Sequence, residues 1–422
     1  MRHYVLFFLV PFTIAVSLLP AAGDPEQMAD RDYWIRRTDF PRPDAEALDE
    51  AIEAARIYYQ NHQLPDGNFR YGLDLTDDVE IDDDNPVRQA GALWGLSVLT
   101  RDRFTENSRR ALILGLDFFM RAMRPVNDGR DMAVTYCSQK RIKTGMVALF
   151  CLAVTDFLEG QHQYLSEELR APYIDALRRN LSFLRSLELE DGSWRELYDH
   201  EVTPEERQLM TESSPYFDGE SLLAYVTALR YFRRHPQYGG VDGLEERVFY
   251  AVPRLFKKYA HDALAAGGDT DLAKGFYQWG CMASAIIGED YSGTPAAKQS
   301  AEGSLALTWW QIYENCVEYR EGNTGYAVEG LVSAWRIAKL QQREEDAAII
   351  RATVERILGR LLTWQVGTVR SKYNPFLVFW QKKGSKRAFG GVLAARNSGY
   401  IRIDNVQHQL HAMLLARRYL FP

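Results

Sequence analysis

The sequence predicts an all-α fold in which six helical hairpins form an inner ring of helices inside an outer ring. Past residue 40, apolar residues recur at spacings of three and four, as at Ile174, Leu177, Leu181 and Leu184, which places them on one face of a helix. Sustained alternation of apolar and polar residues, which is typical of β-strands, is almost absent. A short turn motif also recurs, which indicates that the helices are arranged as repeated pairs.

The recurring motif is an Asp-Gly pair followed by one small polar residue and one aromatic residue. It reads "DGSW" at 191–194 and "DGNF" at 66–69, in each case directly after a helical stripe. Asp begins such a turn by accepting hydrogen bonds from nearby backbone N–H groups, and Gly adopts the left-handed conformation that follows. We therefore expect the motif to close hairpins and to take no part in chemistry.

The second helix of each pair is recognised by its start signal. Asn85 followed by Pro86, and Ser214 followed by Pro215, combine a good N-cap with a residue that loses no hydrogen bond in the first turn. The other starts are expected near Ser138, Lys274, Asn323 and Asp404. These six helices are apolar nearly all round and carry small residues, which a helix buried on several sides requires. The small residues include Ala90, Gly91, Ala92, Gly145, Ala283 and Ala334.

The first helix of each pair is more polar and has one wet face. The expected ranges are 44–61, 104–124, 168–187, 244–265, 299–319 and 345–365. Six helices buried all round and six buried on one side pack most simply as an inner and an outer ring. We expect one domain over residues 40–422.

The "DGSW" turn resembles the motif that closes outer helices in terpenoid cyclases and prenyltransferases, and "DGNF" resembles a looser version of it. The architecture as a whole resembles the α/α-toroid superfamily, which also includes six-hairpin glycosidases, polysaccharide lyases and sugar epimerases. The resemblance covers about residues 40–422. It implies an (α/α)6 toroid in which the loops leading into the inner helices converge at one mouth.

The N-terminal segment predicts export. Basic residues Arg2 and His3 precede an apolar stretch from Tyr4 to Leu19 and small residues before Asp24, which is the pattern of a secretory signal over residues 1–23. An uncleaved membrane anchor is the alternative, because the apolar stretch is near the lower limit of ~17 residues for a spanning helix. We expect a periplasmic or secreted protein that contacts a membrane only through this segment, if it is retained.

Composition narrows the partners. The net charge is −7 and the basic residues are scattered, so nucleic acid is not an expected partner and a neutral or cationic ligand is favoured. The four cysteines lack the close spacing of a structural zinc site, so they are expected to be buried thiols, with one or two disulfides as the alternative. We expect no cofactor and no metal.

Residues near the starts of the inner helices are the candidates for a site, since helix N-termini present their positive dipole ends at the mouth. Carboxylates, aromatic rings and amides together are the usual lining of a carbohydrate cleft. The candidates are Asp82, Asp83, Asp84, Arg88, Gln89, Gln139, Lys140, Arg141, Tyr216, Asp218, Glu220, Tyr277, Trp279, Asn323, Tyr326, Glu329, Asn405, Gln407, His408 and His411.

Glu220 is the expected general acid, because a carboxyl group deep in an apolar helix must find a partner or raise its pKa. Its expected partner is Asp84 or Asp218. The alternative for Asp84 is a solvated acidic loop, and for Asp218 a favourable charge in the first helical turn. Arg88 either pairs with Glu220 or neutralises the acidic run before it.

His408 and His411 share one helical face, with no carboxylate close to them in sequence. They are either packed core histidines or, in the case of His408, a group for proton transfer. Trp279 and Tyr326 are either packing residues or stacking platforms for a sugar ring. Gln89, Tyr216 and Asn405 complete the expected substrate-binding set.

The leading hypothesis is an exported glycan-active enzyme, a glycoside hydrolase acting on an oligosaccharide or polysaccharide with two carboxylates. A polysaccharide lyase or sugar epimerase would instead use His408, Tyr216 and Arg88. A non-catalytic polysaccharide-binding or export accessory protein is a further alternative. An isoprenoid cyclase is a weaker one, because "DDVEID" at 77–82 only loosely approximates an aspartate-rich diphosphate site.

Overall fold

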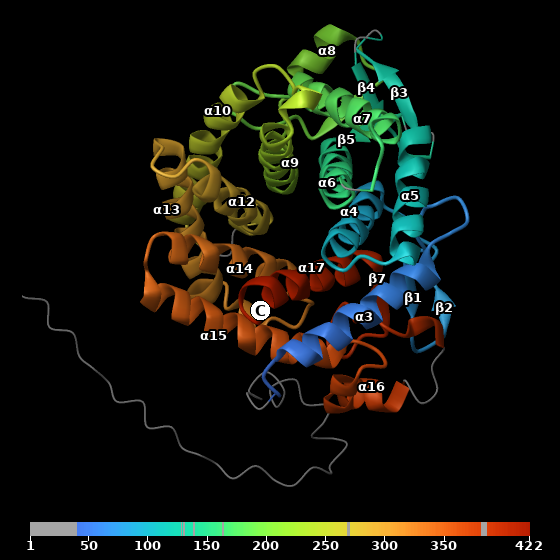
Figure 1. Ribbon diagram of the computed structural model, residues 1–422. Coiled ribbons are helices and arrows are strands. Elements are labelled where there is room, and N and C mark those ends of the chain that lie inside the picture. The colour runs from blue at the N-terminus through green and yellow to red at the C-terminus, as the bar shows by residue number, and fades with distance from the viewer. Residues whose placement is uncertain are drawn as a thin grey trace, which may run out of the picture. The chain divides into compact units, whose positions relative to one another are not determined.

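Helices of an inner and an outer ring alternate along the chain in the computed structural model, which describes residues 40–127, 129, 131–137, 140–162, 164–267, 271–380 and 386–422 (Figure 1). The inner helices in this part are α4 (Pro86–Asp102), α6 (Thr144–Gly160), α9 (Pro215–Arg234), α12 (Asp271–Asp290), α14 (Gly325–Leu340) and α17 (Ile403–Tyr419). The outer helices are α3 (Ala45–His62), α5 (Glu106–Arg121), α7 (Glu167–Ser186), α10 (Leu244–Phe256), α13 (Pro295–Trp309) and α15 (Glu344–Leu361).

Each inner helix packs against the next one in chain order, and α17 packs against both α14 and α4, which closes the ring. The predicted all-α fold of six hairpins in two rings, an (α/α)6 toroid, is therefore confirmed. The small inner-ring residues are buried, as predicted. Gly95 shows why they are needed, because a β-carbon there would lie 2.7 Å from the Tyr59 hydroxyl oxygen and 2.9 Å from Gln407.

Two inner helices begin where their start signals predict. Asn85 accepts hydrogen bonds at its Oδ1 from the N–H groups of Val87 (3.0 Å) and Arg88 (3.2 Å), and Pro86 is the first residue of α4. Pro215 is likewise the first residue of α9. The Asn85 side chain thus satisfies N–H groups that have no partner inside α4, whereas Ser214 makes no such hydrogen bond at the start of α9.

The predicted start near Ser138 is wrong, because α6 begins at Thr144. The preceding residues form strand β5 (Arg141–Lys143), which pairs antiparallel with β6 (Leu197–Asp199). This pairing extends into the helix start, where the Thr144 N–H donates to the Glu196 carbonyl. Ser138 and Gln139 lie outside the described residues.

Two outer helices extend beyond their α-helical parts as π-helical turns. Helix α10 continues into Lys257–Asp262 and then the short helix α11 (Ala263–Ala265), and α13 continues into Trp310–Glu314. The predicted outer segments 244–265 and 299–319 cover both extensions.

The two Asp-Gly turns have the same hydrogen bonds. Asp66 Oδ1 accepts from the Asn68 N–H, and Asp191 Oδ1 accepts from the Ser193 N–H, both at 3.0 Å. Gly67 and Gly192 have φ angles of 105° and 84°, in the left-handed region. The aromatic residue of each turn, Phe69 or Trp194, folds back to pair with the end of the outer helix and is buried. The predicted turn chemistry is confirmed.

Replacing Gly67 with alanine is expected to lower the free energy of unfolding by about 2–4 kcal/mol. The left-handed backbone disfavours any β-carbon, and this one would overlap the backbone oxygen of Leu114 on α5. Gly129→Ala is the matched control, since Gly129 also has a positive φ (81°) but no heavy atom within 4 Å of its β-carbon position. Urea unfolding of both variants measures the difference. An equal loss in both would show that the contact with α5 is unimportant.

Short strands join the first hairpin of the ring to the last. Strand β1 (Gly72–Asp74) lies between β2 (Val79–Glu80) and β7 (Tyr400–Arg402), and both pairs are antiparallel. Gly72 is opposite Arg402 in this sheet. The segment leading into α4 is thereby held beside the segment leading into α17. The remaining described strands, β3 (Met123–Val126) and β4 (Asp131–Val134), form a hairpin after α5.

The predicted signal segment, residues 1–23, lies outside the described residues. Within the described ranges, no helix combines the length and the apolar character that crossing a membrane requires. All four cysteines lie in these ranges as thiols, with Cys151 and Cys281 buried and Cys137 and Cys316 exposed. The prediction of buried thiols therefore holds for two of the four.

Candidate active site

A buried carboxylate lies between two histidines at the end of the ring where the inner helices begin. Glu329 is the fifth residue of α14, and its side chain is fully buried. His408 of α17 places Nδ1 3.2 Å from Glu329 Oε2, and His411, one turn further along, places Nδ1 3.3 Å from Oε1. Residues that are 79 positions apart in the chain thus form one cluster, which we call the Glu329 cluster.

The carboxylate and the histidines of this cluster stabilise each other's charged forms. Burial alone would raise the pKa of Glu329, but the two histidines outweigh it and hold the pKa of this carboxyl below its ordinary value. Burial would likewise lower the pKa of His408, but the charge of Glu329 and the hydrogen bond to it raise that pKa above its ordinary value. Glu329 is therefore ionised and His408 readily takes up a proton.

His408 is the accessible member of the cluster. Its side chain is 23% exposed, whereas those of His411 and Glu329 are 6% and 0% exposed. With Nδ1 directed at Glu329, Nε2 is the nitrogen available to a ligand, and no hydrogen bond to it is formed by the described residues. A histidine oriented by a buried carboxylate and open on its other nitrogen is suited to general acid–base catalysis.

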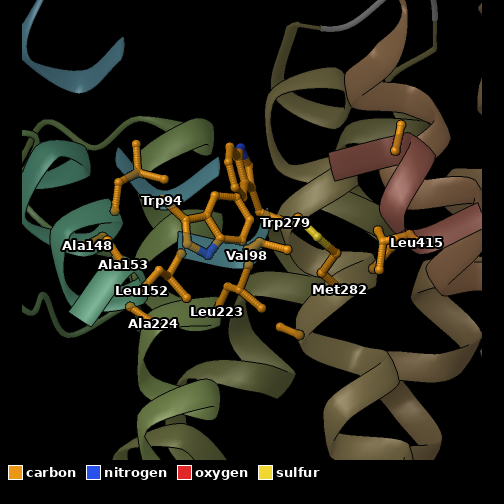
Figure 2. Packing of buried hydrophobic residues seen from close by; sticks show 14 of the residues in the cluster. Trp94, Val98, Ala148, Leu152, Ala153, Leu223, Ala224, Trp279, Met282 and Leu415 are labelled. Carbon is orange, nitrogen blue, oxygen red and sulfur yellow. The ribbon is translucent and has the colours of Figure 1, made fainter. Parts of the chain in front are cut away.

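Two tryptophans surround the histidines. The Trp94 ring lies edge-on to His411, with centroids 4.6 Å apart, and the Trp279 ring lies edge-on to His408 at 6.1 Å. The two indoles are 5.6 Å apart. Figure 2 shows both among the aliphatic residues of the inner helices. Both side chains are buried, so both tryptophans are packing residues of the inner ring.

Glu220 is a buried carboxyl group without a satisfied partner. It is only 3% exposed, and its Oε2 has no hydrogen-bond partner. This oxygen lies against Gly145 of α6, where a β-carbon would overlap it. Burial raises the pKa of Glu220 well above its ordinary value, which favours the neutral acid. The preceding residue, Gly219, packs against Trp279, which links Glu220 to the Glu329 cluster.

Asp218 faces the outer ring. Its Oδ1 accepts a hydrogen bond from the backbone N–H of Trp194 at 2.8 Å, and its Oδ2 accepts one from the Tyr259 hydroxyl at 2.5 Å. The side chain is fully buried. Gln89, at the same fourth position of α4, accepts from the Phe69 N–H at 3.3 Å. In both hairpins the inner helix thus binds the aromatic residue of the Asp-Gly turn. These contacts are those of a structural residue.

Burial raises the pKa of Asp218 to about 7, even though Tyr259 and Trp194 donate to it. The protonated Asp218 carboxyl group therefore stabilises the folded state. This contribution is fully present below the pKa that Asp218 has in the unfolded chain. At most about 4 kcal/mol of it is lost as the pH rises through about 7. We expect the stability difference between wild type and Asp218→Asn to shrink as the pH rises from 4 to 8. Urea unfolding across this range measures it. A difference that stays constant or grows would contradict the raised pKa.

Asp84 belongs to a network on the α4 side. Its Oδ1 accepts from Gln89 Nε2 at 2.8 Å and its Oδ2 from the Tyr136 hydroxyl, which in turn accepts from Asn68 Nδ2 at 2.6 Å. Gln89 Nε2 also donates to the Phe69 carbonyl. The network ties the start of α4 to the loop before α6, and Glu220 is not among the residues that these hydrogen bonds join.

Arg88 has neither of the partners that the sequence suggested. Its Nε lies 3.2 Å from Asp404 Oδ2, and its guanidinium group donates to the Tyr71 hydroxyl. Arg402 binds the same carboxylate at 3.0 and 2.9 Å. The β1–β7 pairing explains this result, because it brings the start of α17 beside the start of α4. The idea that Arg88 pairs with Glu220 or with the Asp82 to Asp84 run is therefore wrong.

The other predicted residues are divided between the ring and its rim. Asn405 and Gln407 of α17 are buried, and Asn405 Nδ2 and Gln407 Nε2 have no hydrogen-bond partner. Tyr216 is 43% exposed at the start of α9. Tyr277 is fully buried, and Tyr326 is partly buried against the core. Asn323 donates a hydrogen bond to Gln409, and Asp82 and Asp83 are exposed. Lys140 forms an ion pair with Glu201, and Arg141 forms one with Asp199.

Sequence reasoning missed the pairing of Glu329 with His408 and His411. The available signal was the position of all three residues near the start of an inner helix, which makes them neighbours once the ring closes. Within the described ranges, no group of His, Cys, Asp and Glu side chains is arranged to hold a metal ion.

No protein-family model and no curated protein sequence matches this chain. Solved structures do match it across its length. An α-1,6-mannanase of Salegentibacter sp. in complex with α-1,6-mannotetrose is 8% identical, with a TM-score of 0.59 over 89% of this chain and 99% of that one. Cellobiose 2-epimerase of Bacillus thermoamylovorans is 12% identical, with a TM-score of 0.55 over 86% and 98%.

An unsaturated glucuronyl hydrolase specific for heparin is 11% identical, with a TM-score of 0.56 over 89% of this chain and 100% of that one. These identities are low enough that the matches establish the fold alone. The chain thus has the (α/α)6 toroid fold that glycoside hydrolases share with sugar epimerases and isomerases.

Proposed function

We propose that this protein is an exported carbohydrate-active enzyme that moves a proton on its sugar substrate through His408, as a sugar isomerase or epimerase does. The observation that carries the proposal is the pairing of the partly exposed His408 with the buried, ionised Glu329. An imidazole held in place by a carboxylate is suited to removing a proton from the carbon beside a carbonyl and returning it. The proposed export is based on residues 1–23.

Residues near His408 suit a neutral sugar. Asn405 and Gln407 lie within three residues of His408 along α17 and are buried, with amide N–H groups that have no partner, and such donors fit hydroxyl and carbonyl oxygens. The acidic run at the start of α4 disfavours an anionic substrate. Structures of the same fold include a D-mannose isomerase and a cellobiose 2-epimerase, which supports a reducing sugar as the substrate class.

Glycoside hydrolysis is the second candidate, because Glu220 has the properties of a general acid. It is a buried carboxyl group with an unsatisfied oxygen, and burial raises its pKa well above the ordinary value. A hydrolase also requires a second carboxylate across the scissile bond. Asp218 faces the outer ring, Asp84 is bound by Tyr136 and Gln89, and Glu329 is held between histidines. The two-carboxylate assignment therefore has less geometric support than the histidine.

A panel of oligosaccharides, each tested with a free reducing end and after borohydride reduction to the alditol, separates the two candidates. An isomerase or epimerase should convert only the free form, without creating new reducing ends. A hydrolase should cleave both forms. His408→Gln should abolish the first activity and Glu220→Gln the second. If the wild type changes no sugar in the panel but binds some of them, the catalytic proposal is wrong and a binding protein is supported.

A further inference from the structure

We propose that the opposite end of the ring carries a binding site for an oxyanion, the chemical group shared by phosphate, sulfate and carboxylate ligands. A cavity of about 440 Å³ opens there, where α4 and α17 end. Its lining includes Arg101, Arg103, Arg417, Arg418, Asp102 and Leu414. The site does not depend on the proposed catalytic function.

Two arginines of this cavity, Arg103 and Arg418, keep most of their hydrogen-bond donors available, whereas Arg417 donates to Asp49 and to the Phe421 carbonyl. A guanidinium group carries five N–H donors. Arg103 uses one nitrogen on Asp49, and Arg418 uses one on Asp102. The other donors of these two side chains have no protein acceptor among the described residues. Both side chains are 41% exposed, so a ligand can reach them from solvent.

Arginines are expected singly at helix C-termini, where the dipole favours a positive charge. Four around one cavity exceed that need, and the carboxylates that pair with them, Asp49, Asp102 and Asp156, are one fewer than the arginines. Converging guanidinium groups bind planar and tetrahedral oxyanions through paired N–H donors. The lining therefore has the chemistry of an anion site.

The floor of the cavity is held rigidly. Arg101 donates to Asp102 at 2.8 Å and also to Asp156, which is 4% exposed. Asp156 in turn accepts from Trp94 Nε1 at 2.8 Å. A buried carboxylate thus fixes Arg101 from the core side, so the guanidinium group faces the cavity in one orientation.

Isothermal titration calorimetry tests this proposal with sodium phosphate, sodium sulfate and sodium glucuronate as separate ligands, at an ionic strength matched with sodium chloride. We expect saturable binding of at least one, and the comparison shows which oxyanion is preferred. The double variant Arg103→Gln/Arg418→Gln should weaken binding at least tenfold. Arg109→Gln/Arg110→Gln on α5, which removes two arginines paired with Glu106, should leave it unchanged.

Absence of saturable binding by all three salts would overturn the proposal, as would equal binding by the wild type and the double variant. Circular dichroism establishes that each variant is folded. If the double variant does not fold, the single variant Arg418→Gln carries the same expectation of weakened binding. Binding that disappears equally in the α5 control would indicate a general charge effect and would also contradict a defined site.

Discussion

Replacing His408 with glutamine is expected to reduce kcat/KM on the enzyme's sugar substrate by about 10²–10⁴-fold, the usual contribution of a general acid–base group. Glutamine can still donate a hydrogen bond to Glu329 but cannot exchange a proton near neutral pH. Because the same substitution removes one partner of the buried Glu329 carboxylate, we also expect it to lower the stability of the ring. Steady-state kinetics, together with a thermal melt of the variant, measure both effects.

The matched control for this variant is His261→Gln. His261 also pairs with a carboxylate, that of Asp262, but it is 78% exposed on the π-helical turn after α10. It should retain wild-type kcat/KM. A His408→Gln enzyme that keeps more than about a tenth of the wild-type activity would rule out the proton-transfer role, since general acid–base groups contribute at least about 10²-fold.

Glu329→Gln is expected to destabilise the protein by about 3–5 kcal/mol near pH 6, because it removes one partner of a buried charge pair. The raised pKa of His408 means that the stabilising pair is fully present below the unfolded pKa of histidine and is lost as the pH rises through the folded pKa. The difference in stability between wild type and variant should therefore be larger at pH 6 than at pH 9. Urea unfolding at both pH values measures it.

The same substitution should change the pH dependence of activity. Without the charge of Glu329, burial lowers the pKa of His408, so the pH at which half of the activity is lost on the acidic side should move down. Glu106→Gln, which removes an exposed carboxylate paired with arginines on α5, should change neither stability nor the profile. An unaltered pH profile in Glu329→Gln would show that the carboxylate does not act on His408.

The ring could be predicted because its signals are local. The Asn85-Pro86 start and the two Asp-Gly turns depend on hydrogen bonds between residues at most three positions apart, and the Ser214-Pro215 start on a proline at the first helical position. The start of α6 could not be found in this way. Its first residue is set by strand pairing with residues 197–199, more than fifty positions further along.

The site was harder to predict for the same reason. Which side a polar residue of an inner helix faces depends on neighbours from other hairpins. Asp218 and Glu220 are two positions apart, yet one contacts the outer ring at Tyr259 and the other lies against Gly145 of the adjacent inner helix. The partner of His408 comes from 79 positions away, and the sequence indicates their contact only through the position of both residues near the start of an inner helix.

Proton exchange with solvent tests the central claim most directly. The sugar substrate identified by the panel is incubated with the wild-type enzyme in D2O, and NMR follows deuterium at the carbon beside the carbonyl group. If His408 transfers the proton, deuterium should appear at that carbon with wild type and at least 100-fold more slowly with His408→Gln. Product formation without deuterium at carbon, or equal incorporation by both proteins, would contradict the account.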